Sequence, residues 1–170
     1  MSLRSHLLRI YGRLPAPLRR TSVRMLTPLF QVGAVCVVNR ADGALLLVRH
    51  SYRKGWGFPG GLLKRGEAPV DAAAREMREE IGLTMDLDDN PHVVVDAPVR
   101  RVDVIYTARL PDGAADPEPQ SAEIVDVGWF APGNLPRLGT EAASTLVELG
   151  RVRPPGSSGP LPSAPVEDGR

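Results

Sequence analysis

The chain has 170 residues, a formal net charge of +1 and 24% charged side chains, which is typical of a soluble globular protein. This length predicts one domain with one sizeable core, and the small net charge excludes a global field that would draw the protein to nucleic acid or acidic membranes. No apolar run is long enough for a membrane span, and no secretory signal pattern is present, so a cytoplasmic protein is expected. The single cysteine, Cys36, excludes an intramolecular disulfide framework and is expected to be a buried core residue.

Residues 1–30 form a basic arm, because arginines recur there and no Asp or Glu precedes Asp42. The bias allows two interpretations, an anionic partner or a solvated terminal arm. Helical spacing predicts one short amphipathic helix in this arm, built on Leu3, Leu7, Ile10 and Leu14. This helix is also the expected contact if the protein forms a homodimer.

A β-rich pattern begins after the arm. Apolar runs predict strands at 32–39, 44–50, 92–99, 102–110 and 123–130. Helical spacing predicts helices over 67–82 and 138–150, whereas the Gly- and Pro-rich stretch 51–61 is expected to be a loop without a regular element. This order predicts an α/β (α+β) domain over 31–150, followed by a disordered Pro-rich tail at 151–170.

The two predicted helices carry end signals. Pro69 suits the first turn of the first helix and Gly82 suits the residue just beyond its end. Thr140 is a candidate N-cap for the second helix, and Gly150 closes it. The apolar face of the first helix is expected to consist of Val70, Ala73, Ala74, Met77 and Ile81.

Three carboxylates lie close together on the first helix. Glu76, Glu79 and Glu80 stand at i, i+3 and i+4, so their side chains share a face, away from the apolar one. Like charges at these spacings repel, and only two arginines of the helix are near to offset them. Oxygen donors gathered in this way are what Mg²⁺ and Mn²⁺ require. The sequence therefore predicts a divalent metal between these glutamates.

The residues from Gly61 to Leu83 follow the pattern G-x5-E-x7-R-E-U-x-E-E-x-G-U, where U is a bulky apolar residue. All nine specified positions are filled, by Gly61, Glu67, Arg75, Glu76, Met77, Glu79, Glu80, Gly82 and Leu83. In this pattern the sequence resembles the Nudix hydrolase family. The resemblance implies an α/β/α sandwich around a mixed β-sheet, and a pyrophosphohydrolase that cleaves a phosphoanhydride in a nucleoside diphosphate linked to another group.

The resemblance also implies roles for the motif residues. Glu76, Glu79 and Glu80 would hold Mg²⁺ or Mn²⁺, often together with the carbonyl of Gly61. Glu67 would hold Arg75 or a metal-bound water, and Arg75 would orient the glutamates through charge-assisted hydrogen bonds. Two carboxylates are candidates for the general base, Glu76 within the motif and Glu123, which opens the last predicted strand.

The substrate is expected to be a small nucleotide. Trp56 or Tyr52 could stack on a base, Arg49 and Arg53 could bind phosphate, and Phe58 is expected to pack its loop on the sheet. His50 and His92 carry no clear signal. Few lysines and a net charge near zero argue against a nucleic-acid partner.

The branch of the family is left open between nucleoside triphosphates and ADP-sugars. The coenzyme A pattern is not matched in register, and arginines occupy the position where diadenosine polyphosphate hydrolases carry a Tyr. Pro98 follows the motif at about the spacing of the ADP-ribose branch, but one Pro near a turn is weak support. A non-catalytic nucleotide sensor or interaction module of the same fold is the alternative function.

Overall fold

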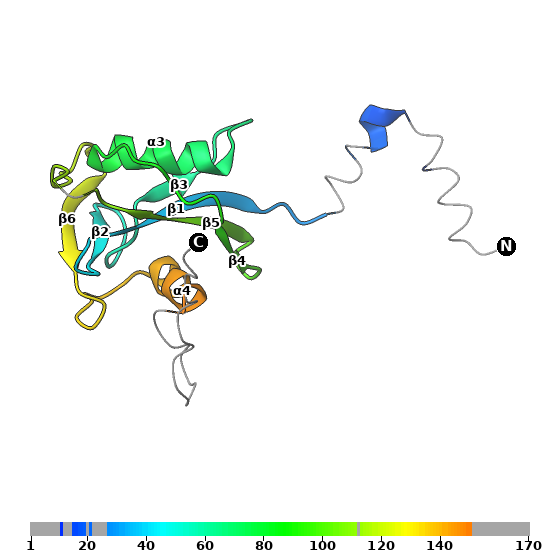
Figure 1. Ribbon diagram of the computed structural model, residues 1–170. Coiled ribbons are helices and arrows are strands. Elements are labelled where there is room, and N and C mark those ends of the chain that lie inside the picture. Colours follow the sequence, from blue (N-terminus) through cyan, green and yellow to red (C-terminus); the bar gives the residue numbers. More distant parts are fainter. Residues whose placement is uncertain (1–10, 12–14, 20, 22–26, 112, 151–170) are drawn as a thin grey trace, which may run out of the picture.

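A mixed β-sheet between two helices organises the chain in the computed structural model (Figure 1). The structure describes residues 11, 15–19, 21, 27–111 and 113–150, so the predicted N-terminal amphipathic helix and the predicted tail lie outside the described residues. The strands are β1 (Gln31–Asn39), β2 (Leu45–His50), β3 (Gly60–Leu62), β4 (His92–Asp96), β5 (Arg101–Arg109) and β6 (Ile124–Phe130). The helices are α3 (Pro69–Ile81) and α4 (Thr140–Glu148).

The described strands follow the order β4-β5-β1-β2-β6, and β3 pairs with β1 outside this path. The strand β1 runs parallel to β5 over its whole length, whereas the β1–β2, β1–β3, β4–β5 and β2–β6 pairs are antiparallel. The strands β1 and β2 form a hairpin that is paired next to its turn, at Asn39 and Leu45, and beyond this pair the two strands separate. That opening leaves the edge of β1 available to β3 beside the start of α3.

The two helices cover opposite faces of the sheet, with α3 above it and α4 below it in Figure 1. Side chains along a strand alternate between faces, so a strand covered on both sides reads as a continuous apolar run. The layer under α3 contains Cys36, Val38, Leu46, Val48, Met77 and Ile81. The layer against α4 contains Val35, Val37, Leu45, Leu47, Ala142 and Leu146. The α/β/α sandwich predicted from the sequence is therefore confirmed.

Core predictions are mostly confirmed. Cys36 is fully buried, Phe58 packs in the layer against α4, and Gly82 ends α3 in the left-handed conformation with φ 72°. Val70, predicted to lie on the buried face of α3, is 42% exposed, and Ala72 is buried instead. The apolar stripe therefore begins with Ala72 and Ala73, which pack with Ala34 of β1 and Tyr106 of β5.

Two local predictions are wrong. The N-cap of α4 is Gly139 rather than Thr140, and no side-chain cap bond is formed. The stretch 51–61 does contain a regular element at its end, because β3 pairs with β1. Gly60 adopts φ 151°, and a Cβ there would lie 2.8 Å from Val35 Cα. The absence of a side chain lets this backbone approach β1 closely enough to pair.

None of the helices in the described part of the chain has the length and apolarity needed to cross a membrane.

Candidate active site

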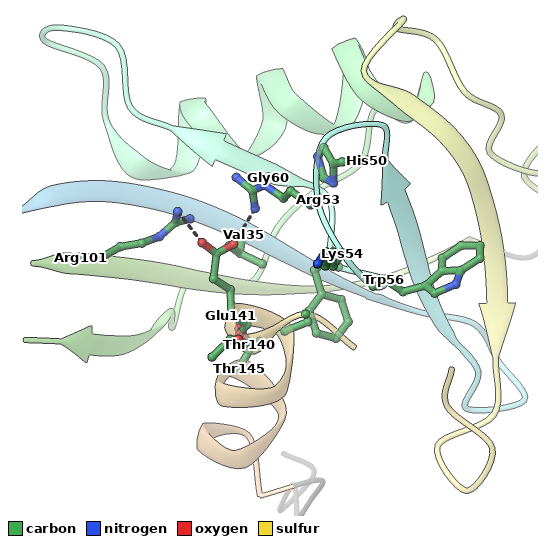
Figure 2. A pocket seen from close by; sticks show the side chains of 15 residues that line it. Val35, His50, Arg53, Lys54, Trp56, Gly60, Arg101, Thr140, Glu141 and Thr145 are labelled. Atoms are coloured by element: carbon green, nitrogen blue, oxygen red, sulfur yellow. Dashed lines mark hydrogen bonds and ion pairs between the residues drawn. The ribbon is translucent and has the colours of Figure 1, made fainter. Parts of the chain in front are cut away.

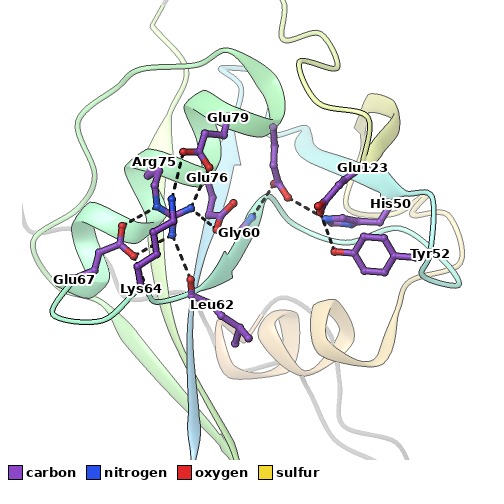
Figure 3. Close-up of polar contacts among 11 residues, drawn as sticks. His50, Tyr52, Gly60, Leu62, Lys64, Glu67, Arg75, Glu76, Glu79 and Glu123 are labelled. Atoms are coloured by element: carbon purple, nitrogen blue, oxygen red, sulfur yellow. Dashed lines mark hydrogen bonds and ion pairs between the residues drawn. The ribbon is translucent and has the colours of Figure 1, made fainter.

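The start of α3 and the short strand β3 lie side by side, and both are anchored on β1. The turn between them is closed by Glu67, whose backbone N–H donates to the Lys64 carbonyl while its carboxylate accepts from the Lys64 N–H at 2.7 Å. Ala73, Met77 and Ile81 bury one side of α3. The motif glutamates therefore occupy the side of α3 that faces β3 and the end of β2 (Figure 3).

Arg75 lies at the centre of three carboxylates (Figure 3). Its Nε and Nη2 donate to the two oxygens of Glu67 at 2.7 and 3.0 Å. Its Nη1 donates to Glu76 Oε1 at 2.6 Å and to Glu79 Oε2 at 3.2 Å, and its Nη2 also reaches the Leu62 carbonyl at 3.3 Å. The side chain of Arg75 is only 11% exposed, so these charge-assisted bonds are shielded from water.

This arrangement changes the interpretation of the glutamate cluster. The sequence predicts a metal ion as the missing positive charge, whereas in the structure the guanidinium of Arg75 already lies between Glu67, Glu76 and Glu79. The repulsion among the three carboxylates is thus offset within the protein itself. Arg75 Nη1 contacts both Glu76 and Glu79 and so brings their carboxylates toward one point.

Glu80 differs from its neighbours. The sequence predicts it on the same face as Glu76 and Glu79, but its side chain is only 7% exposed, whereas that of Glu79 is 52% exposed. Glu80 lies at the edge of the buried stripe because it follows Ala73 by two helical turns. Its Oε2 accepts from the Gly60 backbone N–H at 3.0 Å, and its Oε1 is 3.0 Å from Nε2 of His50. Sequence reasoning gave His50 no role.

The surroundings of Glu76 and Glu67 shift the pKa values of these two carboxylates in opposite directions. Burial raises the pKa of Glu76, although the hydrogen bond and charge of Arg75 act against it. The hydrogen bond from Arg75 and the Lys64 N–H lower the pKa of Glu67 to about 2. Glu67 is therefore ionised under all ordinary conditions and holds Arg75 as a fixed cation.

Among the described residues, no group of three or more His, Cys, Asp and Glu side chains is already gathered tightly enough to hold a metal ion. The donor chemistry nevertheless fits Mg²⁺ or Mn²⁺. Glu76 and Glu79 each place an oxygen within 3.2 Å of a single arginine nitrogen, so they already converge on one cationic position. Hard divalent cations take carboxylate and carbonyl oxygens, which this part of the chain supplies.

The second base candidate, Glu123, lies beside His50 and Tyr52 (Figure 3). Its Oε2 accepts from the Tyr52 hydroxyl at 3.4 Å, and its backbone carbonyl accepts from the Ser51 N–H at 2.8 Å. Partial loss of hydration raises the pKa of the Tyr52 phenol; the positive charge of Arg53 opposes this shift, and the negative charges of Glu123 and Glu80 add to it. The structure thus brings Glu123 and Glu80 within electrostatic reach of one phenol, although they are far apart in the sequence.

A cavity of about 290 Å³ lies on the α4 side of Gly60 (Figure 2). His50 and Gly60 line its upper wall, and the segment that contains Arg53, Lys54 and Trp56 forms its side. This segment is tied to the residues before α4, because the Trp56 N–H donates to the Arg137 carbonyl and the Gly139 N–H donates to the Trp56 carbonyl.

A charged network crosses the cavity (Figure 2). Glu141 of α4 accepts from Arg53 and, through its other oxygen, from Arg101 of β5 at 2.8 Å. Arg101 in turn donates through Nε to both oxygens of buried Asp103 at 2.9 Å. Sequence reasoning missed Glu141 and Arg101, because they meet only where α4 packs against the sheet in which β5 lies beside β1.

The predicted substrate-binding residues occupy different places. Trp56 lines the cavity, but its ring packs edge-on against Phe130 at a centroid distance of 4.8 Å. Arg49 bonds to Asp126 at 3.2 Å and lies 5.9 Å above the Trp56 ring. Tyr52 is 62% exposed and lies beside Glu123 rather than among the lining residues. The structure therefore does not gather the three around one pocket.

Solved structures with the same fold indicate the class of protein to which this sandwich belongs. A MutT NUDIX hydrolase from Burkholderia pseudomallei superposes with a TM-score of 0.61 and 26% identity, over 72% of this chain and 99% of that one. A NUDIX hydrolase from Nitrosomonas europaea gives a TM-score of 0.62 with 21% identity, over 74% of this chain and 72% of that one. This sandwich is the fold of hydrolases of the MutT type.

Residues 29–149 match the family model described as the NUDIX domain, and the chain belongs to the Nudix hydrolase family. A MutT-like protein from Streptomyces ambofaciens is 33% identical over 64% of this chain and 68% of its own length. An RNA pyrophosphohydrolase from Xanthomonas campestris pv. campestris is 43% identical, but only over 32% of this chain and 26% of its own length. The predictions of the family and of a Nudix-type pyrophosphohydrolase are thus confirmed, and the substrate is left unspecified.

Proposed function

We propose that the chain hydrolyses a phosphoanhydride bond in a small nucleotide, with nucleoside triphosphates and ADP-sugars as the two candidate classes. The observation that carries this proposal is the position of Gly60. Its N–H binds the carboxylate of Glu80, and the same residue lines the cavity beside α4. A nucleoside in that cavity would therefore place its phosphates beside the motif glutamates.

The metal-binding residues in this proposal are Glu76, Glu79 and Glu80, with the carbonyl of Gly61. When bound there, Mg²⁺ or Mn²⁺ would neutralise phosphate charge and make water a better nucleophile. Arg75 would position Glu76 and Glu79 through its Nη1 contacts, and Glu67 would hold the guanidinium plane from the other side.

The cavity supplies cationic groups for the phosphates and polar groups for the nucleoside. Arg53 and Lys54 lie along its rim, and Glu141 adds a carboxylate acceptor. Phosphate oxygens would compete with Glu141 for Arg53, which is 38% exposed and therefore able to reorient. Roles for Arg49, Tyr52 and Trp56 in substrate binding stay predictions, as do a homodimer and a cytoplasmic location.

Two carboxylates remain candidates for the general base, and mutants can separate them. Glu76 is half-buried against Arg75, whereas Glu123 is exposed and bonded only weakly to Tyr52. If Glu123 takes the proton of the attacking water, Glu123→Gln should lower turnover and leave Mn²⁺ affinity unchanged. Glu76→Gln should lower both, because Glu76 is also a proposed metal ligand.

The test is a substrate panel with the purified full chain. Nucleoside triphosphates, oxidised purine triphosphates, ADP-ribose, dinucleotides and a 5′-triphosphorylated RNA are incubated with Mg²⁺, with Mn²⁺ and with chelator, and the products are separated by chromatography. Metal-dependent release of a nucleoside monophosphate from a small nucleotide is the expected result. Preferred cleavage of the RNA would contradict the small-nucleotide proposal and would follow the RNA pyrophosphohydrolase relatives instead. Binding without cleavage of any compound would favour the nucleotide sensor.

A further inference from the structure

His50 and Glu80 form a buried polar pair between β2 and α3. Nε2 of His50 is 3.0 Å from Glu80 Oε1, and the two side chains are only 4% and 7% exposed. A carboxylate that binds a metal ion carries no proton and can only accept hydrogen bonds, so in that form of Glu80 the His50 nitrogen is the donor. A buried carboxylate requires such partners, because its charge has lost the hydration of bulk water.

The strand β2 directs the side chain of His50 toward Glu80 of α3. Leu46 and Val48 face the layer under α3, and His50 continues the same face because strand side chains alternate. The pairing of β2 with β6 is regular up to Arg49 and then shifts, so that His50 lies opposite Ile124. The extra residue, Val125, belongs to β6, so the alternation of side chains along β2 is kept up to His50. The ring is also held by Tyr52, edge-on at a centroid distance of 5.4 Å.

The two hydrogen bonds on Glu80 leave it able to bind a cation. The Gly60 N–H occupies one position on Oε2 and His50 occupies one on Oε1. A carboxylate offers about four acceptor positions, so about two remain. Because each carboxylate oxygen of Glu80 accepts one of these hydrogen bonds, the orientation of the carboxylate plane is fixed. By contrast, Glu79 is half-exposed, and within the described part of the chain its carboxylate pairs with the long side chains of Arg75 and Lys64.

We propose that His50 is a positioning residue for Glu80, which holds the carboxylate in the orientation in which it binds the divalent metal. This inference rests on the proposed function only in taking Glu80 as a metal ligand. Partners of metal ligands act in this way by fixing ligand orientation before the ion arrives, and their loss weakens metal affinity. The contribution of His50 is then to metal affinity, and only through it to turnover.

The test uses two amide substitutions that differ in reach. The side-chain nitrogen of Gln corresponds to Nε2 of histidine, whereas that of Asn stops near the Nδ1 position. His50→Gln therefore keeps the donor that Glu80 uses, and His50→Asn keeps the polarity but not the contact. Mn²⁺ dissociation constants are measured on the full chain by electron paramagnetic resonance of the free ion, without substrate. His92→Asn, on an exposed position of β4, is the matched control.

The expected result is that His50→Asn binds Mn²⁺ about 10–100-fold more weakly than the wild type. His50→Gln and His92→Asn should remain close to the wild-type affinity. Equal affinity of His50→Asn and the wild type would overturn the positioning role and leave the proposed function intact, and so would an equal loss in the Gln and Asn variants. If the wild type itself binds no Mn²⁺, the proposed metal site is wrong, and the proposed role of His50 is overturned with it. Thermal melts of each variant confirm that folded proteins are compared.

Discussion

The carboxylate of Glu76 lies directly over the backbone of Gly61, in the space where any other residue would carry its side chain. A Cβ built on Gly61 would stand 2.7 Å from Glu76 Cδ and closer still to Oε1. Gly61→Ala should therefore leave the sheet in place, because the obstructing group is the end of a flexible side chain, but it should displace the Glu76 carboxylate. We expect Mn²⁺ affinity and turnover to fall by about 10–100-fold, as measured by metal titration and initial rates.

Gly133→Ala is the matched control for this substitution, because a Cβ on Gly133 meets nothing within 4 Å. Unchanged metal affinity in Gly61→Ala would show that the position of Glu76 over Gly61 has no part in metal binding.

Gly60 should tolerate no side chain for a different reason. Its φ of 151° lies where L-residues are strained, and an added Cβ would meet the backbone of Ala34 and Val35 rather than a movable side chain. Gly60→Ala should lower the free energy of unfolding by about 1–3 kcal/mol or more, measured by urea denaturation. A stability equal to that of the wild type would mean that β3 can move away from β1 without cost.

Glu79 offers the cleanest test of the metal assignment, because its side chain is 52% exposed and no core packing depends on it. Glu79→Gln should leave the melting temperature within about a degree or two of the wild type, as is usual for surface substitutions. Turnover should fall by at least about 100-fold if a metal ligand is removed. Glu148→Gln, the same chemical change on α4, should alter neither quantity. Wild-type turnover in Glu79→Gln would remove this residue from the metal site.

Acidification should destabilise the protein in part through Glu67. Its pKa in the folded state is about 2, because Arg75 and the Lys64 N–H stabilise the ionised form, whereas an unfolded chain titrates near its ordinary pKa of about 4.3. The stabilisation is therefore complete above the ordinary value and is lost as the pH falls from about 5 toward 2. In chelator, Glu67→Gln should show a shallower loss of unfolding free energy over this range. Identical slopes in the two proteins would contradict this coupling.

Cys36 should be inert in the native protein. It is fully buried under α3, and desolvation raises the pKa of its thiol to about 12. Because the thiolate is the reactive form, a thiol-specific reagent should label the chain only after denaturant is added. Rapid labelling under native conditions would show that β1 opens to solvent.

Several features of the active site could be predicted from the sequence because they depend on local spacing. The motif positions place Glu67, Arg75, Glu76 and Glu79 within one loop and two turns of a helix, and side chains so close in sequence meet whatever the rest of the fold does. The continuous apolar runs of β1 and β2 likewise indicate strands covered on both faces. The contacts of Arg75 follow from the same short-range geometry.

Other features depend on pairing across the fold. His50 meets Glu80 because β2 ends beneath α3, and nothing in the residues around either one signals the contact. The Arg53–Glu141–Arg101 network needs α4 to pack against the face of the sheet where β5 lies beside β1. The burial of Glu80 could not be predicted from helical periodicity either, because it depends on which strand end faces that turn of α3.

The sequence by itself determined the α/β class, the helix that carries the carboxylates and the family of the enzyme, because periodicity and motif spacing are properties of neighbouring residues. The sandwich followed from the resemblance to that family. Only the tertiary structure decided that Glu80 takes partners other than Arg75. Arg75 gathers three of the carboxylates, while Gly60 and His50 hold the fourth apart in a buried site. The physical reason is that burial and hydrogen-bond partners are set by strand register and helix packing, which join residues far apart in the chain.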